Sequence, residues 1–96
     1  MLLKRDLLEK IKAGEVDLVF RRWKRPSVKA GGTLKTKVGL LAIEAMDETT
    51  PEAVTEEEAR RAGFADKDEF WRWLATMKDG HLFHKISVRY VGPAPV

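Results

Sequence analysis

The chain has 96 residues, no cysteine, a net charge of +3, and 44% hydrophobic and 34% charged residues. This composition is typical of one small folded domain: it lacks disulfides, thiolate chemistry and cysteine-based zinc sites, and no apolar run approaches the roughly 18 residues of a membrane span. Because charged residues follow Met1 closely where a secretory signal would be apolar, we expect a soluble cytoplasmic protein with one domain over residues 1–92 and a short tail at 93–96.

The first half of the chain predicts a short helix followed by two strands. Apolar residues recur at helical spacing over residues 3–13, and Gly14 follows as a stop. Residues 16–23 are rich in β-forming side chains and predict the first strand. After a glycine turn at residues 30–33, residues 37–46 predict a long strand. That strand is apolar on both faces, as expected where a sheet closes on itself or is covered by a helix.

The second half predicts two short helices and a final strand. Thr55 and Glu58 form a capping box at the start of the first of these helices, and Gly63 ends it. Asp66 opens the second helix. Its apolar stripe consists of Phe70, Trp73, Leu74 and Met77. Residues 82–91 alternate between apolar and polar side chains as in a half-buried strand. The order of elements predicts an α+β fold, because too little helix lies between the strands for a doubly wound parallel sheet.

The modest net charge hides a separation of charge along the chain. Residues 18–43 contain seven basic residues and no acidic one, whereas residues 44–79 contain eleven acidic residues against five basic ones. The seven basic residues are Arg21, Arg22, Lys24, Arg25, Lys29, Lys35 and Lys37. One interpretation is a basic surface that binds RNA or another polyanion. The other is a solvated strand edge, on which lysine and arginine prevent edge-to-edge aggregation.

Trp23 lies among four of these cations, between Arg22 and Lys24. Arginine suits phosphate recognition because its planar guanidinium contacts two oxygens at once and also stacks on rings. Trp23 would then offer a flat surface on which a base could stack. The alternative for Trp23 is a core residue on the second face of the first strand, and the sequence leaves both open.

The remaining polar residues predict neither a metal site nor a catalytic group. His81 and His84 would point to opposite faces of the last strand, so they do not form a ligand pair, and His84 is expected to be a hydrogen-bonded residue at the rim of the core. Glu44 and Asp47 fall on opposite faces of an ideal strand and predict no paired carboxylates. We therefore assign no metal ligand, no cofactor and no catalytic residue.

Short motifs follow one another along nearly the whole chain in a characteristic order. They are Ile11-Lys12-Ala13-Gly14 and Phe20-Arg21-Arg22-Trp23-Lys24 within residues 8–24, Lys29-Ala30-Gly31-Gly32, Val38-Gly39-Leu40-Leu41, Ala59-Arg60-Arg61-Ala62-Gly63-Phe64 after Thr55, and Leu82-Phe83-His84-Lys85-Ile86-Ser87-Val88. Together they resemble the ASCH domain, a PUA-like family. The resemblance implies a small β-barrel of about five strands with three short helices packed at its openings. It also implies a cleft beside the strand that bears Arg21, and a role in RNA binding.

Some ASCH proteins are enzymes: one branch deacetylates acetylated cytidine and another cleaves RNA. The deacetylating branch reads Gly-x-Lys-x-x-Thr before its arginine. In register with Gly14 and Arg21, this chain has Val16 in place of the lysine and Val19 in place of the threonine. Valine offers neither a base nor a nucleophile, so these two departures from the pattern argue against that activity.

We therefore expect a non-catalytic module that binds single-stranded or structured RNA with low sequence specificity through the seven basic residues and Trp23. Its cleft could also hold a small anionic ligand or a nucleotide. The alternative is an enzyme of the ribonuclease or amidohydrolase type, acting on RNA or a modified nucleoside through unassigned residues. A third hypothesis is a protein-interaction module whose acidic helix, with Glu56, Glu57 and Glu58, engages a basic partner. No interaction with a membrane is expected.

Overall fold

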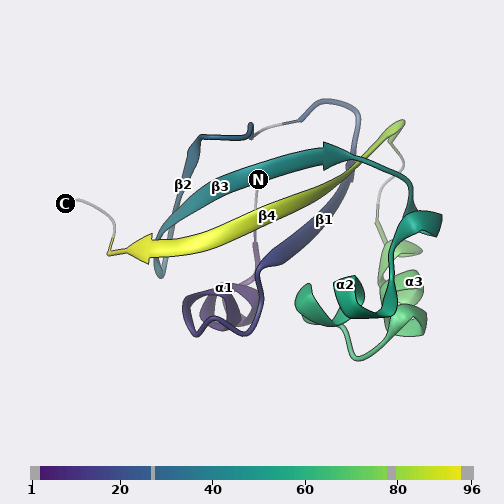
Figure 1. Cartoon of the computed structure of the whole chain (residues 1–96), viewed down its shortest axis with the longest axis horizontal. Helices are drawn as coiled ribbons and strands as arrows, with labels where there is room; N and C mark the ends of the chain where they lie inside the picture. Colours follow the sequence, from purple (N-terminus) through teal and green to yellow (C-terminus); the bar gives the residue numbers. More distant parts are fainter. Residues whose placement is uncertain (1–2, 27, 78–79, 94–96) are drawn as a thin grey trace.

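The computed structural model describes residues 3–26, 28–77 and 80–93 (Figure 1); of the expected tail, residues 94–96 lie outside this part. The elements in chain order are α1 (Arg5–Lys12), β1 (Leu18–Trp23), β2 (Thr33–Thr36), β3 (Gly39–Glu48), the 3-10 helix η1 (Pro51–Ala53), α2 (Glu56–Arg61), α3 (Lys67–Leu74) and β4 (Leu82–Gly92). The α+β prediction is confirmed. Within the described residues no helix has the length and apolar character needed to cross a membrane.

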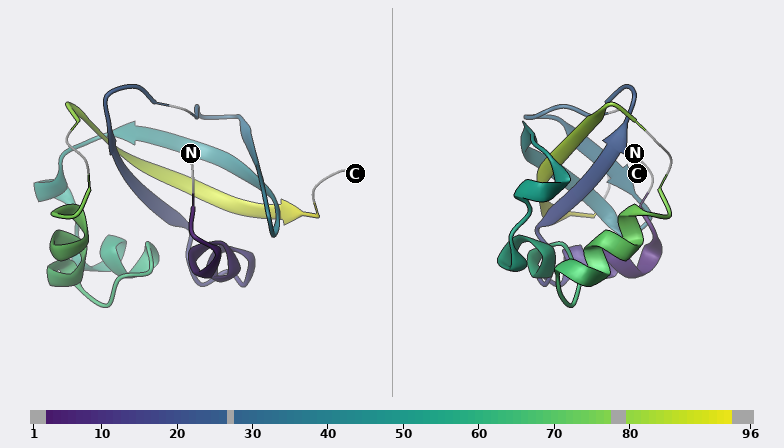
Figure 2. Two further views of the ribbon diagram at one scale, coloured as in Figure 1. Left: turned by 180° about the vertical axis from the view of Figure 1, so that it is seen from behind. Right: turned by 90° about the vertical axis from the view of Figure 1, so that its right-hand side faces the viewer.

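The four strands of the described residues form one antiparallel sheet in the order β1-β4-β3-β2. The sheet curls into a half-barrel, and the three α-helices lie below it in the view of Figure 1, with α1 apart from α2 and α3 (Figures 1 and 2). The expected barrel of about five strands is therefore not seen in the described residues, which form one sheet of four strands. The described residues of the connection between β1 and β2, 24–26 and 28–32, add no strand; Pro26 among them lacks an amide donor, and Gly31 adopts a left-handed φ of 83°.

Several boundaries differ from the sequence prediction. Residues 33–36 form the short edge strand β2, where the sequence analysis predicted a turn at 30–33 and no strand. The long strand begins at Gly39 and not at Lys37. Gly39 has a φ of 137°, and a Cβ there would lie 2.5 Å from the carbonyl oxygen of Gly92. Helix α3 ends at Leu74, so Met77 lies in the turn that follows the helix.

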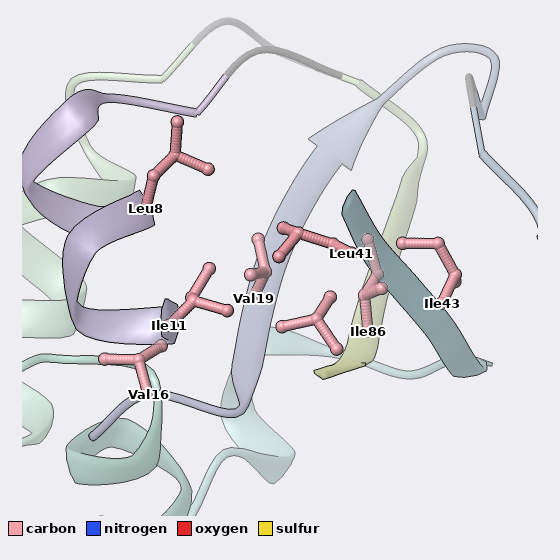
Figure 3. Packing of buried hydrophobic residues seen from close by; sticks show 8 residues of the cluster. Leu8, Ile11, Val16, Val19, Leu41, Ile43 and Ile86 are labelled. Atoms are coloured by element: carbon pink, nitrogen blue, oxygen red, sulfur yellow. The ribbon is translucent and has the colours of Figure 1, made fainter. Parts of the chain in front are cut away.

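The sheet separates two hydrophobic clusters. The cluster on what we call the inner face consists of Leu8, Ile11, Val16, Val19, Leu41, Ile43, Ile86 and Val88 (Figure 3). The cluster on the outer face, between the sheet and helices α2 and α3, consists of Leu18, Phe20, Val54, Ala59, Ala62, Phe70, Leu74 and Phe83. Because successive side chains of a strand point to opposite faces, β1 contributes residues to both clusters.

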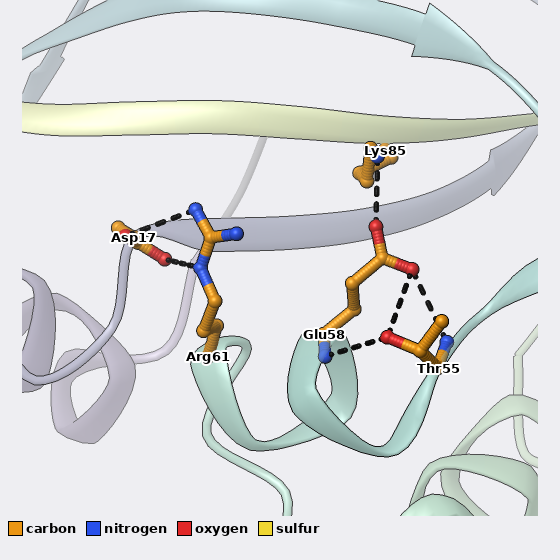
Figure 4. A network of polar contacts seen from close by, with 5 residues as sticks. All are labelled: Asp17, Thr55, Glu58, Arg61 and Lys85. Atoms are coloured by element: carbon orange, nitrogen blue, oxygen red, sulfur yellow. Dashed lines mark hydrogen bonds and ion pairs between the residues drawn. The ribbon is translucent and has the colours of Figure 1, made fainter.

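Helix α2 is attached to the sheet by a polar network (Figure 4). Its predicted capping box is confirmed: the Thr55 hydroxyl accepts from the Glu58 amide at 3.1 Å, and the Glu58 carboxylate accepts from the Thr55 amide at 3.1 Å. Glu58 also accepts from the Lys85 ammonium on β4 at 2.7 Å. At the other end of the helix Arg61 donates to both carboxylate oxygens of Asp17, at 2.9 and 3.1 Å. The hydrogen bond from Lys85 is the main cause that lowers the pKa of Glu58, while partial burial acts in the opposite direction.

We expect the Glu58 carboxylate to make stability depend on acid. A carboxyl whose pKa is lower in the folded state contributes stability above its unfolded pKa, near 4.3, and this contribution is lost as the pH falls through the folded pKa. Glu58→Gln keeps the capping acceptor but removes the charge. Its free energy of unfolding, measured by urea titration, should fall less between about pH 6 and pH 3 than that of the unmodified protein, by up to about 1 kcal/mol.

The matched control is Glu57→Gln, which removes the same charge from an exposed neighbour in the same turn. It should leave the acid dependence of the unmodified protein in place. Parallel stability profiles for the unmodified protein and Glu58→Gln would show that the ion pair with Lys85 contributes nothing.

Candidate functional site

The structure does not bring the seven basic residues of the first half onto one surface. Strand β1 ends beside the start of β4, where Trp23 pairs with Leu82, whereas β3 begins beside the end of β4. Lys35 on β2 and Lys37 in the turn to β3 lie at this second end. The eleven residues of β4 separate the two ends, a span of roughly 30 Å at about 3.3 Å per residue.

A cleft of about 410 Å³ lies beside β1, between α1 on one side and α2 and α3 on the other. We call it the β1 cleft. On the α1 side it is lined by Lys4, Leu7 and Lys10, and on the strand by Val19 and Arg21. Leu7 and Lys10 of α1 and its N-cap residue Lys4 recur at intervals of three, and residues so spaced share one face of a helix.

The opposite wall of the β1 cleft includes two aromatic side chains. Phe64 and Trp73 line it with their ring centroids 5.2 Å apart, and Glu69 and Met77 lie on the same side. Gly63, with a φ of 96°, ends α2 and turns the chain so that the Phe64 amide donates back to the Ala59 carbonyl at 3.0 Å. Phe64 thereby packs against the helices and forms part of the wall.

Arg21 lies half-buried against the open edge of β1. The Val88 amide donates to the Asp17 carbonyl at 3.0 Å, so the backbone of Asp17 faces β4. In an antiparallel pair every second residue faces the partner strand in this way. Phe20 lies three residues after Asp17, and its carbonyl therefore points away from β4. Nη1 of Arg21 donates to this carbonyl at 2.8 Å. Burial lowers the pKa of Arg21, although a guanidinium stays charged at any physiological pH. Arg21 thus covers a strand edge and lines the cleft as well.

Arg22 points to the outer face, away from Arg21. Its Nη2 donates to the carbonyl oxygens of Leu74 at 3.2 Å and Met77 at 3.0 Å, where α3 ends. The last carbonyls of a helix have no partner within it and carry partial negative charge, so a guanidinium is well suited to them. Arg22, predicted from sequence as a phosphate contact, therefore holds α3 and its part of the cleft wall against β1.

Trp23 is half-buried and packs against the inner-face cluster. Its indole Nε1 donates to Nδ1 of His84 at 2.8 Å, and His84 is only 7% exposed. The prediction that His84 is a hydrogen-bonded residue at the rim of the core is confirmed. For Trp23 the structure favours packing over a free stacking surface. His81 is exposed and precedes β4.

Three of the predicted basic residues are exposed on the connection that follows β1. They are Lys24, Arg25 and Lys29. Lys29 also borders an open hollow of about 500 Å³ under this connection, lined mainly by apolar side chains and backbone. Lys24 and Arg25 therefore lie toward the same end of the molecule as Arg21, and Lys35 and Lys37 toward the other. Lys29 lies between the two ends, because its carbonyl accepts from Gly32, which itself pairs with Ile43 in the middle of the sheet.

The chemistry available in the β1 cleft is mixed. Lys4, Lys10 and Arg21 supply positive charge, and Asp6 and Glu69 supply carboxylates. The sequence analysis did not predict Lys4 and Lys10 as binding residues. Their spacing with Leu7 on a predicted helix would have placed them on one face. Among the described residues no three His, Cys, Asp or Glu side chains lie close enough together to hold a metal ion.

Comparison with known proteins identifies the fold and no activity. No protein-family model matches the sequence, and no curated protein matches it. In structure the chain is similar to the crystal structure of the hypothetical protein PH0355, with a TM-score of 0.76 over 93% of this chain and 94% of that one, at 14% sequence identity. Membership of the ASCH family remains a prediction from the sequence motifs.

We expect Arg22→Ala to destabilise the protein by about 2 kcal/mol, because it removes charge-assisted hydrogen bonds to two carbonyls at the end of α3. Lys24→Ala, which removes a neighbouring exposed charge, should change stability by less than about 0.5 kcal/mol. Urea unfolding followed by circular dichroism measures both. Equal effects of the two substitutions would contradict the role assigned to Arg22.

Proposed function

We propose that this protein binds single-stranded RNA through the β1 cleft and the exposed basic residues that follow β1. The observation that carries the proposal is the composition of the cleft. It has a guanidinium against its strand side, two lysines on its α1 side and an aromatic wall on its α2–α3 side. Phosphate neutralisation by cations and stacking of bases on aromatic rings are the two interactions by which proteins hold single strands without reading sequence.

The size of the cleft favours one unpaired nucleotide over a duplex. A volume of about 410 Å³ lies within the range of sites for small organic ligands, about 300–1,000 Å³. A base entering between Leu7 and Trp73 would contact apolar surface on both sides, and its phosphate would lie near Lys4, Lys10 or Arg21. Single-stranded RNA supplies such splayed nucleotides, whereas a paired base stays within its stack.

The exposed cations extend this surface. Lys24 and Arg25 follow Arg21 by three and four residues, which is about 10–14 Å along an extended chain and thus one or two nucleotides. Lys29 continues the same connection. Arg22 is not part of the proposed contact surface, because its guanidinium is engaged with α3.

We expect Lys24→Ala/Arg25→Ala to weaken binding to a short unstructured RNA and to reduce the steepness of its salt dependence. Each lost phosphate contact lowers the slope of log K against log salt by about 0.7 for single strands, so two contacts account for about 1.4. Filter binding at salt concentrations from about 50 to 200 mM measures both quantities.

The control is Lys35→Ala/Lys37→Ala, which removes the same charge at the other end of β4. It should leave the affinity and the slope nearly unchanged. Equal weakening by both pairs would mean that only net charge matters, and binding that is absent or independent of salt would contradict the proposal.

A second comparison on one helix tests the cleft itself. Lys10 lines the β1 cleft, whereas the ammonium of Lys12 lies 5.8 Å from the ring centre of Tyr90. Lys10→Ala should weaken RNA binding several-fold, and Lys12→Ala should change it by less than about twofold, because only Lys10 neutralises phosphate there. Electrophoretic mobility shifts with one RNA measure both variants. A stronger effect of Lys12→Ala would locate the binding surface elsewhere.

The second candidate is an enzyme acting on RNA or a modified nucleoside. The observation that favours it is that two carboxylates, of Asp6 and Glu69, line the same cleft as Arg21, since carboxylates are common general acids and bases. The assay is incubation with RNAs and acylated nucleosides. Turnover that is lost in Glu69→Gln while RNA binding persists would favour the enzyme over the binding module.

A further inference from the structure

The hydrogen bond between Trp23 and His84 exists in only one protonation state. Trp23 is the last residue of β1, and its Nε1 lies 2.8 Å from Nδ1 of His84. An indole N–H can donate but not accept, so Nδ1 must carry no proton. The imidazole in this structure is therefore neutral, with its proton on Nε2.

Protonation of Nδ1 would place an N–H donor of His84 opposite the N–H donor of the Trp23 indole. The indole would lose its acceptor, and a charged imidazolium would remain at a site that is only 7% exposed. Two N–H donors that face each other repel, so the rings would separate.

Charged groups face His84 from both neighbouring strands. In the sheet His84 pairs with Arg21 on β1 and with Glu48 on β3, and both share its inner face. Arg21 opposes protonation of His84 and Glu48 favours it. Helix α1, which packs on this face, adds Lys4 and Lys10 on the side of Arg21.

The main chain of Trp23 is held independently of its side chain. A Cβ on Gly80 would lie 2.6–2.8 Å from the backbone atoms of Trp23, so the segment entering β4 packs directly on this residue. Trp23 is also paired with Leu82 in the ladder. The side chain can therefore leave His84 while β1 keeps its register.

We infer that protonation of His84 releases the Trp23 indole from the inner face and thereby makes the end of β1 responsive to pH. Lys24 and Arg25 follow this residue directly and are exposed. A released indole beside them would add a ring to the proposed RNA surface, a consequence that rests on the proposed function. The release itself does not depend on RNA.

The test is a pH titration of the indole N–H signals by nuclear magnetic resonance, from about pH 8 to about pH 5. Trp23→Phe identifies the signal of Trp23. The signal should move in one step that shares its midpoint with the ring protons of His84. Hydrogen exchange of this indole should rise roughly fivefold relative to that of Trp71, an internal reference that is 38% exposed, because one hydrogen bond confers about that protection.

Two variants separate the histidines. His84→Gln offers an amide oxygen as acceptor but does not titrate, so the Trp23 signal should become independent of pH. His81→Gln removes the exposed histidine and should leave the titration unchanged. A Trp23 signal that stays constant to about pH 5 in the unmodified protein, or that moves equally in His84→Gln, would overturn the inference.

The experiment remains decisive if His84→Gln fails to fold. In that case the shared midpoint in the unmodified protein and in His81→Gln supports the inference, and different midpoints overturn it. RNA binding measured at both ends of the same pH range keeps the two proposals distinct. A protein that binds no RNA at either pH contradicts the proposed function, whereas the indole titration alone decides the release of Trp23.

Discussion

Burial of β1 on both faces is the constraint on which the rest of the structure depends. Leu18, Val19 and Phe20 are consecutive, and each is only 2% exposed. Val19 packs with α1 on the inner face, while Leu18 and Phe20 pack with α2 and α3 on the outer face. Because β1 is an edge strand, helices on both of its faces leave a hollow between them along its open side. The β1 cleft is this hollow, so it results from the same packing that forms the two clusters.

The alternation of β1 also separates the two arginines that follow Phe20. Arg21 takes the inner face and lines the cleft, whereas Arg22 takes the outer face and binds the carbonyls at the end of α3. Two adjacent and chemically identical side chains therefore have different roles: Arg21 lines the cleft, and Arg22 positions the cleft wall. A count of basic residues in the sequence does not distinguish these roles, because the difference arises from the direction in which each side chain leaves the strand.

Features determined by neighbouring residues could be predicted from the sequence. The capping box of Thr55 and Glu58, the end of α2 at Gly63 and the burial of His84 all follow from local spacing and side-chain chemistry. The separation of Lys35 and Lys37 from Arg21 could not be predicted, because it depends on the insertion of β4, the last strand in sequence, between β1 and β3. Likewise, the partners of Arg22 lie 52 and 55 residues away. Strand β2 was missed because its four residues lie at an edge and show little burial.

The hydrogen bond from Arg21 to the Phe20 carbonyl has a thermodynamic consequence for any ligand of the cleft. An anion that draws the guanidinium toward itself uncovers a carbonyl on an open strand edge, and the free energy of that loss is subtracted from the affinity. Ligand occupancy and edge accessibility are then linked quantities, and by reciprocity a second strand that adds to this edge would change the affinity of the cleft for anions by the same factor. Arginine at this position therefore links anion recognition to protection of the open strand edge.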